Sequence, residues 1–321
     1  MSGVVPTPSE PATPPPAATA VPLAGRLRLR PLPAIVRACR PRQWLKNLLV
    51  LAAPAAAGAL VWPEVPERLV ATFVAFCALS SSTYLLNDLH DRAEDRLSER
   101  RRARPIAAGE VSAGFAVAAA VLLAAGGLTL AWLVTPWLAA VALGYLLLTG
   151  SYTLWWRQIA VADIAAVAGG FILRALAGGV AADVAVSRWF LAVTSFGALF
   201  LVAGKRYSEL RAAGREDGAG GVTRASLAEY SERYLMFVVG LAATATTTAY
   251  CLWAFQRSHQ ARLSWYELTV IPFVLWLLRY ALLVDRGGGE SPDELVLTDR
   301  FLLITGAAWA ALFVAGVYVV G

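Results

Sequence analysis

Long apolar stretches, separated by short polar segments, run through almost the whole chain. Each is close to the length of about 20 residues that an α-helix needs to cross a membrane. They lack the two-residue alternation of barrel strands, so they predict helices. The pattern therefore predicts an all-α polytopic membrane protein, a bundle of nine transmembrane helices at about 45–62, 68–87, 113–135, 137–155, 159–180, 188–204, 233–255, 265–284 and 300–320.

The beginning of the chain differs from the rest. Residues 1–25 are rich in Pro, Ala, Ser and Thr without apolar periodicity, which predicts a disordered tail. Residues 26–44 interleave arginine with Leu, Ile and Val, so we expect a basic segment along an anionic membrane surface. Residues 45–321 then form the nine-helix transmembrane domain.

Composition and charge agree with this organisation and add an orientation. Hydrophobic residues make up 58% of the chain and charged residues only 16%, which is far from the composition of soluble domains. Lys and Arg concentrate in alternate loops, and positive charge marks the cytoplasmic side. The N-terminus and the long loops after the second and sixth spans are therefore predicted to be cytoplasmic, in a multi-pass protein of the cell membrane. The positive residues predicted on the opposite side of the membrane are Arg68, Arg188, Arg257 and Arg262, while Arg174 and Arg279 lie within spans.

Carboxylates gather where the second span ends. On a helix, Asp88, Asp91 and Asp95 share one face, with Asn87 beside them and Tyr84 one turn earlier. Like charges on one face repel unless a cation neutralises them, and oxygen ligands suit Mg²⁺. The alternative is a solvated acidic helix end that pairs with neighbouring arginines. The position at the mouth of a membrane bundle favours the magnesium site.

A cationic run, which includes Arg101 and Arg104, follows this cluster. Carboxylates beside guanidinium groups suit a polyphosphate substrate, because Mg²⁺ can bridge phosphate oxygens while arginine binds the others. For any single arginine, the positive-inside rule is an equally good explanation. The prediction therefore rests on the carboxylates and the arginines lying next to each other in the sequence.

Polar residues also occur inside or next to other spans. Lys46 and Asn47 begin the first span and can face a cavity, although Trp44 and Lys46 can equally be anchors at the membrane interface. Asp163 and Arg174 lie about three turns apart on one face of the fifth span. Charged residues within spans usually face a partner or a cavity. A structural ion pair is the alternative to a substrate site.

The second long loop begins with Lys205, Arg206 and Glu209. Lys205 and Glu209 have the spacing of an ordinary salt bridge on a helix surface. The functional hypothesis is an anion site that faces the first loop. The three cysteines, Cys39, Cys77 and Cys251, have no metal-type spacing and predict neither a disulfide framework nor a zinc site.

The pattern Asn87-Asp88-x-x-Asp91-x-x-x-Asp95 resembles the first Asp-rich motif of the UbiA-type intramembrane prenyltransferases. The resemblance extends over 44–47, 104–109 and 163–174. It implies a nine-helix bundle with cytoplasmic caps after the second and sixth helices. It also implies an Mg²⁺-dependent transferase whose metal is held by Asn87, Asp88, Asp91 and Asp95.

The chain departs from typical members at the second motif. Where they carry another Asp-rich run, Lys205 and Arg206 precede Glu209. This resembles the branch that transfers a phosphoribosyl group from phosphoribosyl pyrophosphate to a polyprenyl (decaprenyl) phosphate for cell-wall arabinan. In that branch we expect Lys205 and Arg206 to bind the 5-phosphate, and Lys46 and Arg174 to bind the lipid phosphate.

Two alternatives stay open. One is a conventional prenyltransferase that acts on an aromatic acceptor for a quinone or haem precursor. The other is a secondary transporter that uses Asp163 and Arg174, although carriers place their sites at midplane and here charge concentrates in loops. The sequence has no nucleotide-binding P-loop. We expect a membrane partner and no nucleic acid, and leave open whether the protein is a homo-oligomer.

Overall fold

The computed structural model describes residues 33–99, 101–213, 225–258, 265–289 and 291–318, so the predicted tail 1–25 lies outside the described residues. Eight helical spans of the described chain are long and apolar enough to cross a membrane. The prediction of an all-α, multi-pass membrane protein is confirmed. The spans are α3 (Val65–His90), α5 (Ala113–Val134), α6 (Pro136–Leu154), α7 (Ala162–Ala181), α8 (Arg188–Ala213), α10 (Glu232–Ser258), α11 (Trp265–Leu268) continued by α12 (Val270–Asp285), and α14 (Arg300–Tyr318).

The first predicted span, 45–62, is not one long α-helix. It consists of a 3₁₀-helix, η1 (Pro41–Leu51), then α2 (Ala52–Ala56), and after a left-handed Gly58 the short η2 (Ala59–Val61). A 3₁₀-helix of this length is uncommon. The count of nine long helices is therefore not reproduced among the described residues, where this span is a composite of short helices.

Close packing against α7 accompanies this irregular first span. Pro54 has no N–H, so it cannot donate to the carbonyl of Val50 four residues earlier. Gly178 on α7 lies directly against that carbonyl, and a Cβ at Gly178 would stand only 1.7 Å from the Val50 oxygen. The two backbones meet because α7 has no side chain at this position.

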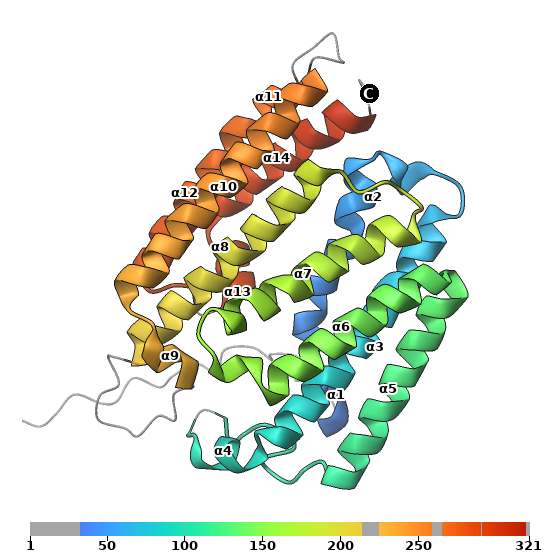
Figure 1. The fold of residues 1–321 in the computed structure, drawn as a ribbon, viewed down its shortest axis with the longest axis vertical. Helices are drawn as coiled ribbons and strands as arrows, with labels where there is room; N and C mark the ends of the chain where they lie inside the picture. Colours follow the sequence, from blue (N-terminus) through green and yellow to red (C-terminus); the bar gives the residue numbers. More distant parts are fainter. Residues whose placement is uncertain (1–32, 100, 214–224, 259–264, 290, 319–321) are drawn as a thin grey trace, which may run out of the picture. The chain divides into compact units, whose positions relative to one another are not determined.

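The long helices pack mainly against their neighbours in the chain (Figure 1). The main contacts pair α3 with α5, α6 with α7, α8 with α7 and α10, and α12 with α14, while η1 packs on α7 and α3. One apolar core joins η1, α3, α5, α6 and α7, and a second joins α8, α10 and α12. This arrangement leaves the connections between helices at the two ends of the bundle.

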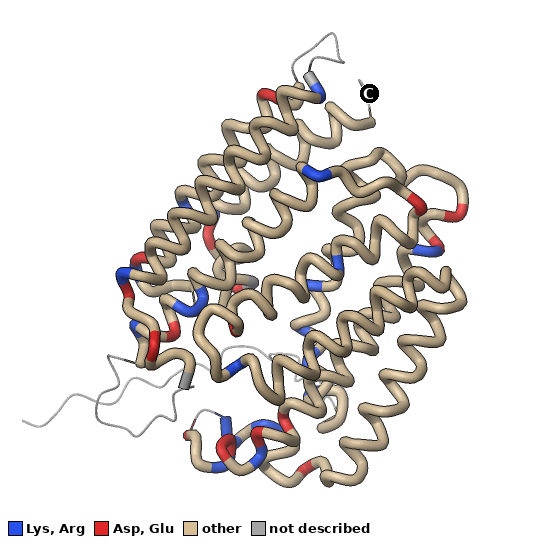
Figure 2. The backbone as a smooth tube through the Cα atoms, viewed as in Figure 1, with Lys and Arg blue, Asp and Glu red and all other residues tan. Residues whose placement is uncertain are grey.

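Charged residues gather at one end, around the short helices α4 (Arg92–Leu97), α9 (Ala225–Glu229) and α13 (Pro292–Thr298), as Figure 2 shows. The middles of the long helices carry few charges. Outward apolar side chains such as Leu133 and Trp137 are 74% and 77% exposed, as expected of a surface that lipid covers. The remaining short helices are α1 (Ala34–Ala38) and η3 (Trp156–Gln158).

Candidate functional site

The Asp-rich stretch lies at the charged end, on two helices rather than one. Asp88 is on the last turn of α3, Asp91 separates α3 from α4, and Asp95 is on α4. The backbone N–H of Asp95 still donates to the carbonyl of Asp91 at 2.8 Å, so helical spacing continues through the break. The three carboxylates are 2%, 5% and 0% exposed. A buried acidic cluster needs compensating charge.

Four arginines from three segments supply that charge. Arg104 Nη1 lies 3.2 Å from Oδ1 of Asp88 and 2.8 Å from Oδ2 of Asp95. Arg40 donates to Asp88, and Arg157 donates to Asp91. Arg101 approaches Oδ1 of Asp95 at 3.3 Å. The structure thus places Arg101 and Arg104, which the sequence associates with a polyphosphate, directly against the carboxylates.

The residues present suit a hard divalent cation, although the arginines separate them here. Among the described residues, no three carboxylate, thiol or imidazole groups converge on one point. Arg104 stands between Asp88 and Asp95. Oδ1 of Asp95 is buried and accepts no hydrogen bond. Carboxylate and amide oxygens are ligands that Mg²⁺ prefers, so the donor chemistry fits.

Asn87 and Tyr84 extend the cluster along α3. Asn87 Nδ2 donates to Oδ2 of Asp91 at 3.2 Å, and its Oδ1 accepts from the hydroxyl of Thr153 at 3.5 Å. The guanidinium of Arg40 lies 5.2 Å from the ring centre of Tyr84, within the range of a cation–π contact. Asn87 therefore contacts one of the carboxylates directly, and Tyr84 contacts an arginine that pairs with another.

A second polar cluster lies deeper, between η1, α3, α6 and α7. Arg174 donates through Nε to Oδ1 of Asn47 at 2.7 Å and through Nη2 to the hydroxyl of Tyr145 at 2.8 Å. Asn47 is fully buried and donates to Ser80 Oγ at 3.2 Å. None of these partners is charged. Lys46 precedes this cluster on η1 and is half-buried.

The ion pair between Asp163 and Arg174, which was the alternative to a substrate site on α7, does not form. Asp163 instead accepts from Arg206 Nε at 2.8 Å, because the charged end of α8 packs beside the start of α7. Arg174 is too far along α7 to reach it, at eleven residues or about 16 Å of helix. The alternative of a structural ion pair is therefore wrong in its choice of partner.

Arg206 is the centre of a third cluster and is only 4% exposed. Besides Asp163, it contacts Oε2 of Glu209 at 2.6 Å and the hydroxyl of Tyr152 at 3.2 Å. Lys205 and Glu209 form the predicted i,i+4 pair, with 3.9 Å between Nζ and Oε1. Tyr230 adds a hydroxyl that donates to Oδ1 of Asp163 at 2.6 Å.

The site residues that sequence reasoning missed include Arg40, Tyr145, Tyr152, Arg157 and Tyr230. Arg40 lies in the segment expected at the membrane surface, yet it contacts Asp88 and has a left-handed φ of +54°. In the sequence, Arg157 is only the single positive charge of the short loop between two predicted spans. The signal in the sequence is its isolation, since no other charge lies within five residues of it.

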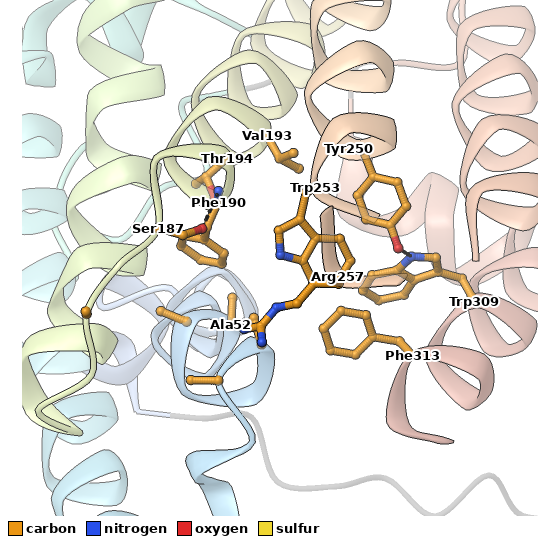
Figure 3. A pocket seen from close by; sticks show the side chains of 14 residues that line it. Ala52, Ser187, Phe190, Val193, Thr194, Tyr250, Trp253, Arg257, Trp309 and Phe313 are labelled. Carbon is orange, nitrogen blue, oxygen red and sulfur yellow. Dashed lines mark hydrogen bonds between the residues drawn. The ribbon is translucent and has the colours of Figure 1, made fainter. Parts of the chain in front are cut away.

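An apolar cavity of about 140 Å³ lies at the other end of the bundle. Small side chains of α2, including Ala52, form one wall (Figure 3). Trp253 on α10 and Trp309 and Phe313 on α14 form another, and Arg257 is the charged residue of the lining. Phe190 places the start of α8 beside the same space.

Known proteins resemble this chain over most of its length. It is 44% identical over 296 residues to the decaprenyl-phosphate phosphoribosyltransferase of Mycolicibacterium smegmatis, covering 88% of this chain and 92% of that protein. It is 42% identical over 291 residues to the protein of the same name from Corynebacterium glutamicum, covering 89% and 87%.

The fold also matches solved structures. A UbiA homologue from Archaeoglobus fulgidus, bound to GPP and Mg²⁺, superposes with a TM-score of 0.66 at 18% identity, over 88% of this chain and 98% of that one. Residues 48–304 match the UbiA prenyltransferase family, as the resemblance of the Asp-rich motif implies. The chain therefore belongs to the UbiA prenyltransferase family.

Proposed function

We propose that this protein transfers the 5-phosphoribosyl group of phosphoribosyl pyrophosphate to a polyprenyl phosphate and releases pyrophosphate. The similarity to two decaprenyl-phosphate phosphoribosyltransferases supports the reaction. The structural observation that carries it is the pairing of three buried carboxylates with four arginines at one end of the bundle. Such a site suits a soluble polyphosphate better than an apolar acceptor.

The carboxylate cluster is the proposed site of the pyrophosphate. Asn87, Asp88, Asp91 and Asp95 would hold Mg²⁺, which neutralises phosphate charge when bound. Arg104 and Arg101 lie within 3.3 Å of Asp95, so they can turn from the carboxylates to phosphate oxygens without crossing the bundle. Guanidinium groups bind phosphate in pairs of hydrogen bonds and stabilise the leaving pyrophosphate.

In the reaction, the bond between the anomeric carbon of ribose and the pyrophosphate oxygen breaks. An oxygen of the lipid phosphate forms the new bond to that carbon. A phosphate monoester is already largely ionised near neutral pH, because its second pKa is about 6. No side chain therefore needs to remove a proton from the acceptor.

Two further groups of residues would bind the remaining phosphates. Lys205 and Arg206 lie on α8 and are proposed to bind the ribose 5-phosphate. Lys46 and Arg174 are proposed to attract the lipid phosphate, since among the described residues no carboxylate pairs with Arg174. The charged end would face the cytoplasm, where the positive-inside rule places it.

The apolar cavity suits the prenyl chain of the acceptor. Its Ala52 lies six residues after Lys46, which corresponds to about 12 Å of 3₁₀-helix. A long isoprenoid whose phosphate is held by Lys46 and Arg174 can reach the cavity. The walls of Trp253, Trp309 and Phe313 are apolar enough to accept it.

The test is the identity of the lipid product. Purified full-length protein receives radiolabelled phosphoribosyl pyrophosphate and decaprenyl phosphate, with Mg²⁺ or with EDTA. We expect a labelled phosphoribosyl lipid with Mg²⁺ only. A parallel arm with prenyl diphosphate and an aromatic acid detects a conventional prenyltransferase, and a product only in that arm would refute the proposal.

The carboxylate assignment has its own test with a matched control. Asp88→Ala and Asp95→Ala should abolish the Mg²⁺-dependent product while the protein stays folded. Glu99→Gln removes an exposed carboxylate from the same loop and should retain activity. Near-normal transfer by both aspartate variants would show that the metal and pyrophosphate are bound elsewhere.

A further inference from the structure

The connection between α6 and α7, residues 155–161, touches both loops at the charged end. We call 91–112 the first cap loop and 225–231 the second cap segment. Arg157 donates from Nη1 to Oδ1 of Asp91 in the first cap loop. Its backbone carbonyl accepts a hydrogen bond from the hydroxyl of Ser226 at 2.8 Å, in the second cap segment. One buried residue therefore contacts both.

The end of the same connection makes a second contact with the second cap segment. The N–H of Val161 donates to the hydroxyl of Tyr230 at 2.5 Å, and that hydroxyl donates to Oδ1 of Asp163. Val161 has a positive φ of +68°, which is costly for a β-branched residue. Surrounding structure must maintain such strain, which is common at functional sites. Here the strained backbone directs an N–H at Tyr230.

The contacts continue to the substrate-binding residues on both sides. On one side, Arg157 orients Asp91, a proposed metal ligand. On the other, Tyr230 orients Asp163, which in turn holds Arg206 at 2.8 Å. Burial raises the pKa of Tyr230, and its hydrogen bond to Asp163 raises that pKa further, so the hydroxyl stays protonated as a donor. Tyr230 is therefore the donor and Asp163 the acceptor of this hydrogen bond.

We propose that the connection at 155–161 couples the two cap elements, with Arg157 and Tyr230 as positioning residues for the transfer reaction. The proposal rests on the proposed function in assigning substrate phosphates to the two sides. Arg157 acts through Asp91 and Tyr230 acts through Asp163. The coupling fixes the spacing between the pyrophosphate site and the site of the 5-phosphate.

Hydrogen–deuterium exchange of the full-length protein tests the coupling without substrate. Tyr230→Phe removes only the shared hydroxyl. We expect faster exchange in the second cap segment and also in residues 87–99, which Tyr230 does not contact directly. Tyr234→Phe is the matched control, because its ring stacks on Tyr230 with centroids 5.9 Å apart while its own side chain is exposed. Faster exchange confined to 225–235 in Tyr230→Phe would overturn the coupling.

Kinetics test the positioning roles. Loss of a group that orients a metal ligand typically costs about 10–100-fold in activity. We expect Arg157→Gln to lower kcat within that range and Tyr230→Phe, which acts through Asp163, to lower kcat as well, each with a smaller change in KM for phosphoribosyl pyrophosphate. Arg157→Lys keeps the charge and should recover part of the loss. A rise in KM alone would mean direct substrate contact and would contradict the proposal.

The double variant Arg157→Gln/Tyr230→Phe separates coupling from two independent defects. Residues that act through one element are not additive, so the combined loss should be smaller than the product of the single losses. A full product would overturn the proposal. If Arg157→Gln does not fold, Ser226→Ala replaces it, since it removes one hydroxyl that bonds to the same connection. Its expected result is again faster exchange in 87–99, and an unchanged rate there would overturn the coupling.

The two proposals fail in different ways. Exchange rates depend on the fold of the charged end and not on which substrate is used. If no phosphoribosyl lipid forms in any variant but Tyr230→Phe still loosens 87–99, the proposed function is wrong and the coupling is real. If the product forms but 87–99 does not respond, the coupling is wrong and the function stands.

Discussion

Nη1 of Arg104 lies 2.8 Å from Oδ2 of Asp95, whose side chain is fully buried, while that of Arg104 is 29% exposed. The same nitrogen also reaches Asp88 at 3.2 Å. A cation in this position compensates two buried carboxylates at once. The proposed function requires Arg104 to exchange these contacts for one with a substrate phosphate.

Replacing Arg104 tests this role. Arg104→Gln should lower kcat/KM for phosphoribosyl pyrophosphate by about 100-fold, the size of effect seen when one stabilising donor is removed from a transition state. Arg102→Gln, two residues away and exposed, is the control and should change it little. Initial rates of labelled lipid formation measure both. Equal rates for the two variants would show that Arg104 only neutralises aspartates.

A different prediction concerns the buried amide of Asn47, which joins η1 to α3 and α7. Asn47→Ala removes the hydrogen bonds to Ser80 and from Arg174. Hydrogen bonds between membrane helices contribute about 0.6–1.7 kcal/mol each, so we expect a loss of about 1–3 kcal/mol in unfolding free energy. Arg68→Lys, whose partner Glu64 is exposed, should be nearly neutral. Denaturant unfolding in detergent measures the difference, and an unaffected Asn47→Ala would contradict the structural role.

The carboxylate cluster could be predicted from the sequence because its geometry is local. Asp88, Asp91 and Asp95 follow helical spacing, and Arg104 is 16 residues from Asp88. By contrast, Arg40 and Arg157 reach their aspartates across 48 and 66 positions. Only tertiary packing brings such residues together. In the sequence each is one more positive charge on the side that is predicted to be cytoplasmic.

The helices also divide into those that the sequence predicts and one that depends on tertiary packing. Apolar length predicts α3 and the seven long spans that follow it, since hydropathy reports what a segment must bury in lipid. Hydropathy does not report which hydrogen-bond pattern a helical segment adopts, so the sequence predicts the first span as one helix. Pro54 was visible in the sequence, but the contact between Gly178 and the Val50 carbonyl depends on how α7 packs.

That contact gives a prediction about stability. Gly178→Ala would place a methyl group 1.7 Å from a backbone oxygen, so η1 or α7 must move. Overpacking typically costs about 1–3 kcal/mol, and here backbone rather than a side chain must yield. Gly144→Ala is the control, because nothing lies within 4 Å of its added carbon. Thermal unfolding should show a lower Tm for Gly178→Ala only, and equal Tm values would mean that the two backbones do not meet.

The last prediction concerns pH and the start of α14. The side chain of Arg279 donates to Asp299 at 2.7 Å, and the backbone N–H of Leu302 donates to the same carboxylate at 2.9 Å. These hydrogen bonds, with that of Arg279 the larger cause, lower the pKa of Asp299 below its ordinary value. A group with a lowered folded-state pKa stabilises the protein above its unfolded pKa, about 3.9 for Asp. That stabilisation is lost as the pH falls through the lowered value.

Asp299→Asn should therefore be less stable than the wild type at neutral pH, and the difference should shrink as the solution becomes acidic. Unfolding midpoints across a pH series measure it. Glu67→Gln, which removes an exposed carboxylate at the other end of the bundle, should show no such convergence. A constant difference between Asp299→Asn and the wild type down to strongly acidic pH would mean that the charge of Asp299 does not contribute. In that case the neutral hydrogen-bonding capacity of the side chain alone would account for its effect on α14.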